Sequence, residues 1–154
     1  MRRLGLNAIL SLGLAAGLAA PAQASSFPLT LNDQWVFPLG FDQAVAFGGD
    51  TGPGYVLGLE ASVVRLDASL WWAGLVGSVR RDYALDPVIY AVGGELGWAF
   101  LGFEAAAEFE DGEVGGRFRF VFPLGLGAPY VGWRTAHDTR WEAGLLLKFP
   151  IGLE

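Results

Sequence analysis

The stretch that decides the fold is residues 103–122, FEAAAEFEDGEVGGRFRFVF. On both sides of Asp111-Gly112 the residues alternate. Apolar side chains occupy one face of each run, and charged ones such as Glu104 and Glu108 occupy the other. A period of two is that of a β-strand, and Asp-Gly between two such runs signals a two-residue type I′ turn. The stretch therefore predicts a β-hairpin.

The charges of this hairpin are placed so that they meet. With a two-residue turn, Glu104 lies opposite Arg119 and Glu108 lies diagonal to Arg117. Opposite charges that face each other across a strand pair stabilise the pairing. The hairpin thus has one charged face and one phenylalanine face.

The same alternation recurs along the chain and predicts eight strands. Besides the two runs of the hairpin, the predicted strands are residues 41–47, 55–65, 68–80, 88–98, 129–136 and 140–149. In the last pair, a turn at residues 137–139 and pairing about Asp138 place Arg134 opposite Glu142.

The first 24 residues have the composition of a secretory signal peptide. Arg2 and Arg3 give a basic start, residues 4–20 are apolar, and residues 21–24 supply the small residues of a cleavage site. The alternative is an N-terminal membrane anchor. We expect an exported protein with three parts: a signal peptide at 1–24, a periplasmic lead-in or extension of the first strand at 25–40, and a β-barrel at 41–154.

The rest of the chain is too apolar for an ordinary soluble domain, with 53% hydrophobic residues and a mean hydropathy of +0.39 over the whole chain. Its longest uncharged stretch, residues 120–133, contains two prolines and is shorter than the roughly 20 residues of a spanning helix. A bilayer accepts only helices or closed barrels, because every backbone polar group must be satisfied internally. The pattern therefore favours an all-β fold, an antiparallel up-and-down transmembrane β-barrel of eight strands.

Alternation alone also fits a soluble sandwich or a lipocalin-like barrel. Two features favour the membrane. The polar stripe consists of glycine, alanine, serine and a few Glu and Arg, and Lys148 is the single lysine, whereas a water-facing stripe is normally rich in lysine. The aromatic stripe is also larger than the outside of a soluble protein carries. The longest predicted loops, 48–54 and 81–87, fall on one side, as external loops do.

On these features the chain resembles the small eight-stranded outer-membrane barrels of the OmpA-transmembrane-domain and OmpX-like class. The resemblance implies a monomer in the cell outer membrane that contacts outer-membrane lipid or lipopolysaccharide and the barrel-assembly machinery. Such barrels usually end on an aromatic residue, whereas this chain ends with five residues after Phe149.

The polar face gives the candidate functional site, an interior charge network. Side chains just fill an eight-stranded barrel, and an unpaired buried charge is costly. We therefore expect these charges to pair and to plug the barrel rather than to line a pore. The predicted members are Glu60, Glu95, Glu104, Glu108, Arg117, Arg119, Arg134 and Glu142.

Composition excludes several functions. The chain has no cysteine and one histidine, so thiolate sites, disulfides and multi-histidine metal sites are excluded. An isoelectric point of about 4.7 argues against nucleic acid. We expect no cofactor and no metal. His137, Thr139 and Glu142 loosely resemble the catalytic arrangement of outer-membrane lipid A deacylases, but no serine occupies the nucleophile position.

The sequence therefore favours a non-enzymatic outer-membrane barrel with a structural or envelope-integrity role. The alternatives are a barrel that binds or conducts small hydrophobic molecules or lipids, lipocalin-like if soluble, and, with less support, a lipid A-modifying enzyme. Residues 80–82, Arg-Arg-Asp, are predicted at an outer strand end, either solvated or touching lipopolysaccharide phosphates.

Overall fold

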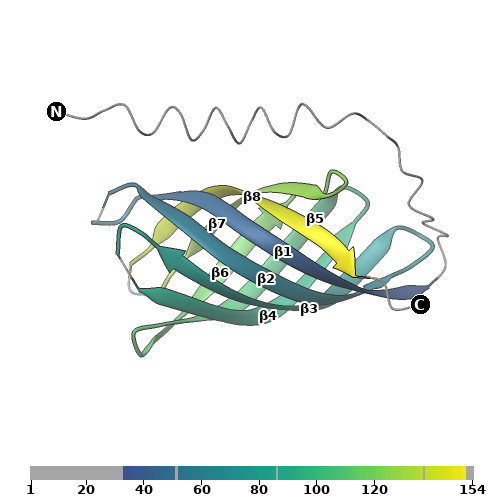
Figure 1. Ribbon diagram of the computed structural model, residues 1–154, viewed down its shortest axis with the longest axis horizontal. Coiled ribbons are helices and arrows are strands. Elements are labelled where there is room, and N and C mark those ends of the chain that lie inside the picture. Colours follow the sequence, from purple (N-terminus) through teal and green to yellow (C-terminus); the bar gives the residue numbers. More distant parts are fainter. Residues whose placement is uncertain (1–32, 51, 86, 137, 152–154) are drawn as a thin grey trace. The chain divides into compact units, whose positions relative to one another are not determined.

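In the computed structural model, which describes residues 33–151 except 51, 86 and 137, alternating residues form eight antiparallel strands (Figure 1). Each strand pairs with the next in the chain, and β8 pairs with β1, so the sheet closes into a barrel. The strands are β1 (Gln34–Phe47), β2 (Gly54–Leu66), β3 (Trp71–Asp82), β4 (Val88–Trp98), β5 (Leu101–Glu110), β6 (Glu113–Val121), β7 (Gly127–Arg134) and β8 (Arg140–Ile151).

The predicted signal peptide, residues 1–24, lies outside the described residues, as do residues 25–32. β1 begins at Gln34, so residues 34–40 belong to the first strand. Within the described part of the chain, no helix is long and apolar enough to cross a membrane.

The strand registers fix the tilt of the barrel. A path of paired residues that starts at Val36 in β1 and passes once through every strand returns to β1 at Ala46, ten residues further along. In a barrel of eight strands this stagger corresponds to a tilt of about 40° from the axis. At that tilt the 11 residues of β4 extend about 27 Å along the axis. The slant of the strands is visible in Figure 1.

The hairpin of β5 and β6 confirms the prediction from residues 103–122. Glu104 pairs with Arg119, and the turn residues Asp111 and Gly112 have φ angles of +48° and +86°. Two successive residues with positive φ are the requirement of a type I′ turn. Asp111-Gly112 therefore sets the register that brings the charges together.

A substitution at this turn has a predictable cost. A Cβ at Gly112 has nothing within 4 Å, so only the positive φ resists a larger residue. We expect Gly112→Val to lower the free energy of unfolding by about 1–2 kcal/mol. Urea unfolding in lipid vesicles measures the change. Asp111→Asn is the control because asparagine tolerates positive φ, and an equal loss in that variant would contradict the explanation.

The hairpin of β7 and β8 corrects a predicted pairing. Arg134 lies opposite Arg140 rather than Glu142, which pairs with Gly132 instead. Both arginines contact one oxygen of Asp82 in β3, Arg134 at 2.5 Å and Arg140 at 2.6 Å. The shared carboxylate offsets the repulsion that facing like charges otherwise have.

The predicted strand 68–80 also begins later than expected. Residues 67–70 form a turn in which the backbone N–H and the hydroxyl of Ser69 donate to Asp67 Oδ1, at 2.8 and 2.9 Å. These hydrogen bonds lower the pKa of the Asp67 carboxyl. Leu70 follows with a φ of +68°, a conformation that a strand does not continue. β3 therefore starts at Trp71.

The barrel has two ends. At the loop end lie the connections 48–53, 83–87, 111–112 and 135–139, and at the terminal end lie 67–70, 99–100, 122–126, the start of β1 and the end of β8. Successive side chains point alternately into the barrel and away from it. The inward face carries the candidate site.

Candidate functional site

The eight residues predicted for the interior network all point into the barrel. None is more than 5% exposed. They come from β2 (Glu60), β4 (Glu95), β5 (Glu104 and Glu108), β6 (Arg117 and Arg119), β7 (Arg134) and β8 (Glu142).

The structure adds members that sequence reasoning missed. Arg80 and Asp82 were expected at a solvated strand end, yet they are 1% and 0% exposed and point inward, so that prediction was wrong for both. Trp71 and Trp72 are large apolar residues at consecutive positions, so alternation did not show which residues of β3 share a face. The other additions are Asp42 in β1, Glu110 in β5, Tyr130 in β7, and Arg140 and Lys148 in β8.

Arg80 is the centre of the network near the loop end. Its guanidinium donates to Glu108 Oε1 at 2.5 Å and to Glu142 Oε2 at 2.8 Å, and it lies 3.7 Å from Asp42 Oδ2. All four side chains are at most 1% exposed. One arginine from β3 therefore links β1, β5 and β8 across the interior.

Arg117 and Glu104 form the tightest pair of the predicted set. Arg117 donates from Nε at 2.8 Å and from Nη2 at 2.5 Å to Glu104 Oε1. The pairing partner of Glu104 in the sheet, Arg119, is further from its carboxylate, at 3.5 Å. The register of β5 and β6 is as predicted. The closest ion pair of Glu104 is nevertheless with Arg117, its diagonal neighbour, because Arg119 reaches across the interior to other carboxylates.

Arg119 binds carboxylates from β1 and β2. It donates to Asp42 Oδ2 at 2.5 Å and to Glu60 Oε2 at 3.0 Å, and its guanidinium lies 4.3 Å from the centre of the Tyr130 ring. The Tyr130 hydroxyl donates to the other oxygen of Asp42 at 2.7 Å. Both Asp42 oxygens therefore accept hydrogen bonds. These contacts join β1 and β2 to β6 and β7 across the interior.

Hydrogen bonds connect the described loop residues to each other and to the network at the loop end. Arg140 donates to the carbonyl of Gly52 in the β1–β2 loop, and the Asp50 N–H donates to Asp138 Oδ2 at 3.0 Å. Arg134 also contacts Glu110 at 3.1 Å. The β1–β2 loop is therefore held to the β7–β8 connection beside it.

The terminal end is filled by Lys148 and Trp72. Lys148 Nζ lies 3.0 Å from Glu60 and 2.8 Å from Glu95, and its side chain is 20% exposed. The Trp72 ring occupies the space beside Gly97 and Gly102, where an added Cβ comes within 2.4 Å of ring atoms. These two glycines make room for the inward tryptophan.

The described interior is consequently a mutually paired network of carboxylates and cations. Its acidic members are Asp42, Glu60, Asp82, Glu95, Glu104, Glu108, Glu110 and Glu142, and its basic members are Arg80, Arg117, Arg119, Arg134, Arg140 and Lys148. Buried ions persist only when paired and hydrogen-bonded. This arrangement ties the barrel wall together across its interior.

The three residues that loosely resemble a deacylase site lie only in part within the described residues. His137 lies outside them, and Glu142 points inward, where it binds Arg80 rather than facing the outer surface. No group of three or more potential metal ligands occurs among the residues that the structure describes.

The outward face is apolar between its ends. Aromatic side chains ring the loop end (Phe47, Tyr55, Tyr83, Tyr90, Phe109 and Trp141) and the terminal end (Trp35, Trp71, Trp98, Phe100, Phe122 and Phe149). The large aliphatic side chains exposed between these two rings include Leu59, Leu75, Val79, Val92 and Val131. On the described strands, the charged side chains of this face are Arg65 near the terminal end and Arg81 near the loop end.

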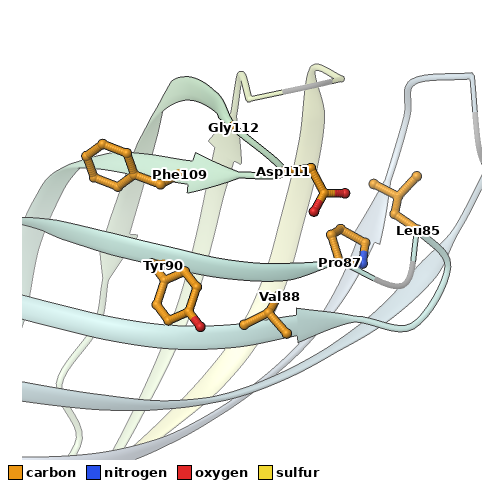
Figure 2. Close-up of a pocket in the computed structure, with 7 residues that line it drawn as sticks. All are labelled: Leu85, Pro87, Val88, Tyr90, Phe109, Asp111 and Gly112. Carbon is orange, nitrogen blue, oxygen red and sulfur yellow. The ribbon is translucent and has the colours of Figure 1, made fainter.

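A recess of about 560 Å³ lies on this outer surface at the loop end (Figure 2). It is bounded by residues of the β3–β4 loop, the adjoining parts of β4 and β5, and the β5–β6 turn. The labelled side chains include Leu85 and Pro87 from the loop, Tyr90 and Phe109 from the strands, and Asp111 from the turn. The recess is outside the barrel and separate from the interior network.

The comparisons with known proteins add one structural similarity. No family model and no curated protein matches the chain. Among solved structures, the chain is similar to one described as "De novo design of transmembrane beta-barrels", with 11% sequence identity and a TM-score of 0.48, covering 73% of this chain and 95% of that chain. The strand pairing itself, rather than this likeness, establishes the closed barrel.

Proposed function

We propose that the chain is a non-enzymatic integral β-barrel of the cell outer membrane, with a structural or envelope-integrity role and an interior plugged by ion pairs. The observation that carries the proposal is the inversion of polarity. Charged side chains are buried inside, whereas the outside exposes a continuous apolar band. In water such a surface is unfavourable, and in a bilayer it is the surface that a barrel presents to lipid.

The dimensions of the apolar band fit a bilayer. Arg81 lies opposite Leu57, and Leu57 and Arg65 are eight residues apart in β2, which is about 20 Å along the axis at the tilt of these strands. The two arginines extend the band further, because their side chains reach outward toward water. The height of the apolar band is therefore close to the apolar height of about 25 Å in outer-membrane barrels. The aromatic rings at both ends lie where such barrels have aromatic girdles.

The orientation and the partners complete the proposal. The loop end faces the outside and the terminal end faces the periplasm, since external loops are the longer ones. Lipopolysaccharide and outer-membrane lipid surround the apolar band, and Arg81 is placed at the outer rim to contact lipid phosphates. The barrel-assembly machinery inserts the chain, which functions as a monomer.

The interior does not favour the alternative of a binder or conduit for hydrophobic molecules. Such a site needs a mostly apolar cavity, whereas the inward face described here holds paired ions. The deacylase-like alternative has no support from Glu142, whose carboxylate is bound to Arg80.

Fractionation tests the location. Cells that express the full-length gene are separated, the envelope is washed with carbonate, and the membrane fraction is run on SDS gels with and without boiling. We expect a carbonate-resistant band in the outer-membrane fraction that shifts on heating. A soluble periplasmic protein without a heat shift would contradict the proposal.

Reconstitution tests the plug. Liposomes that contain the folded barrel are expected to be no more permeable to salt and small sugars than protein-free liposomes, because paired side chains fill the described interior. Stopped-flow swelling measures the permeability. Rapid swelling in arabinose, with the barrel shown to be folded by its heat shift, would contradict a plugged interior.

A further inference from the structure

The outward face contains a groove that runs from the middle of the apolar band toward the terminal end. It lies over β1, β2, β3 and β4, and Ile151 of β8 also lines it. Its volume is about 470 Å³, and its lining is almost entirely apolar. The groove exists because small residues lie between large ones. Ala61 and Gly77 pair across β2 and β3, and a Cβ added at Gly77 meets only a carbonyl oxygen, at 3.9 Å. Phe37, Leu39, Val63 and Leu75 form its higher walls.

Arg65 stands where this groove reaches the rim of the barrel. It follows Val63 by two residues in β2, so both side chains are on the outward face. It is paired with Trp35 in β1 and with the small Ala73 in β3. A cation flanked by an aromatic side chain thus lies two residues beyond Val63, which lines the groove.

The ion pair that Arg65 forms in this structure is weak. Its guanidinium lies 2.8 Å from Asp33, and both side chains are 57% exposed. An exposed ion pair contributes little to stability, because water and salt screen it. A phosphate group accepts two parallel hydrogen bonds from a guanidinium, which makes it a stronger partner than an exposed carboxylate held in water.

We propose that the groove and Arg65 together bind one anionic phospholipid, with an acyl chain along the groove and the headgroup phosphate on Arg65. The inference rests on the proposed insertion into a membrane, which places the groove among acyl chains and Arg65 at headgroup level. Trp35 lies at the depth where tryptophan is enriched in membrane proteins. The recess at the loop end differs, because Asp111 in its lining repels an anionic headgroup.

Lipid retention by the folded protein tests the site. The purified barrel in mild detergent is mixed with equal amounts of phosphatidylglycerol and phosphatidylcholine, and native mass spectrometry counts the lipids retained. We expect one phosphatidylglycerol on the unaltered protein. Arg65→Gln removes the charged contact and lowers retention about tenfold, the effect of losing one charge-assisted hydrogen bond. Gly77→Leu fills the groove and lowers retention similarly.

Matched controls come from the same face. Arg81→Gln removes the outward arginine at the opposite rim, and Ala143→Leu enlarges a small outward residue of β8 that is not part of the groove. Both are expected to retain phosphatidylglycerol like the unaltered protein. Equal losses in Arg65→Gln and Arg81→Gln, or equal retention of the two lipids, would overturn the proposal.

Flotation with liposomes separates this inference from the proposed function. If every variant floats and resists carbonate but Arg65→Gln retains lipid normally, the lipid site is wrong and the membrane barrel stands. If the unaltered protein does not float, both are wrong.

Discussion

Replacing Arg80 with methionine is expected to lower the free energy of unfolding by about 3–5 kcal/mol, the cost of breaking a buried ion pair. Arg80 contacts Glu108, Glu142 and Asp42, and none of these side chains has more than 1% exposure. Methionine keeps an unbranched apolar stem but has no charge, so three carboxylates lose a cation that they share. Urea unfolding in lipid vesicles, followed by the heat-dependent gel shift, measures the loss.

The adjacent residue supplies the control. Arg81 is on the outward face, where it lies 5.5 Å from the centre of the Tyr83 ring. Exposed cation–π contacts contribute about 0.5–1 kcal/mol, so Arg81→Met is expected to lower stability much less than Arg80→Met. Equal effects of the two substitutions would show that Arg80 does not organise the interior.

The second large effect concerns the pair of Glu104 and Arg117. Glu104→Met leaves two donor nitrogens of a fully buried arginine without their acceptor, and we expect a loss of about 3–5 kcal/mol. The double variant Glu104→Met with Arg117→Met is expected to recover most of this loss. Replacing a buried ion pair by apolar side chains of similar volume is often neutral, whereas removing one partner is costly.

A double-mutant cycle measures the coupling. The account predicts a double variant that is more stable than Glu104→Met alone. Strictly additive losses would mean that the two residues contribute independently, and the pairing would then not be what holds this part of the barrel together.

The extent to which the sequence predicts this fold differs between its two best hairpins. Around Asp111-Gly112 the turn allows one register, because both central residues adopt positive φ, and Glu104 therefore meets Arg119 as predicted. Between β7 and β8 the connection 135–139 is longer and does not determine the register. Two arginines face each other there only because Asp82, from a strand distant in sequence, lies between them.

Alternation predicted part of the inward face, but it missed Arg80 and Asp82 and could not predict the contacts across the interior. Within each strand, alternation assigns Glu60 or Glu142 to the same face as the residues two positions away. It does not tell which strands face each other across a closed barrel. The contact of Arg80 with Glu142 and that of Arg119 with Asp42 join residues separated by 62 and 77 positions. These pairs depend on the closure of the barrel and on the stagger of its strands. The residue pattern of a single strand contains neither.

Single-cysteine spin labelling shows whether the outward face of the barrel lies against lipid. The chain contains no cysteine, so each introduced thiol is unique. Labels at Leu75 and Val92, in the middle of the apolar band, are compared with a label at Val114 beside the β5–β6 turn, in the barrel reconstituted into liposomes.

We expect labels at Leu75 and Val92 to collide readily with oxygen and hardly with a water-soluble nickel chelate, whereas the label at Val114 shows the opposite. Free access of the nickel chelate to Leu75 and Val92 in correctly folded protein would contradict the account, because the apolar band would then face water.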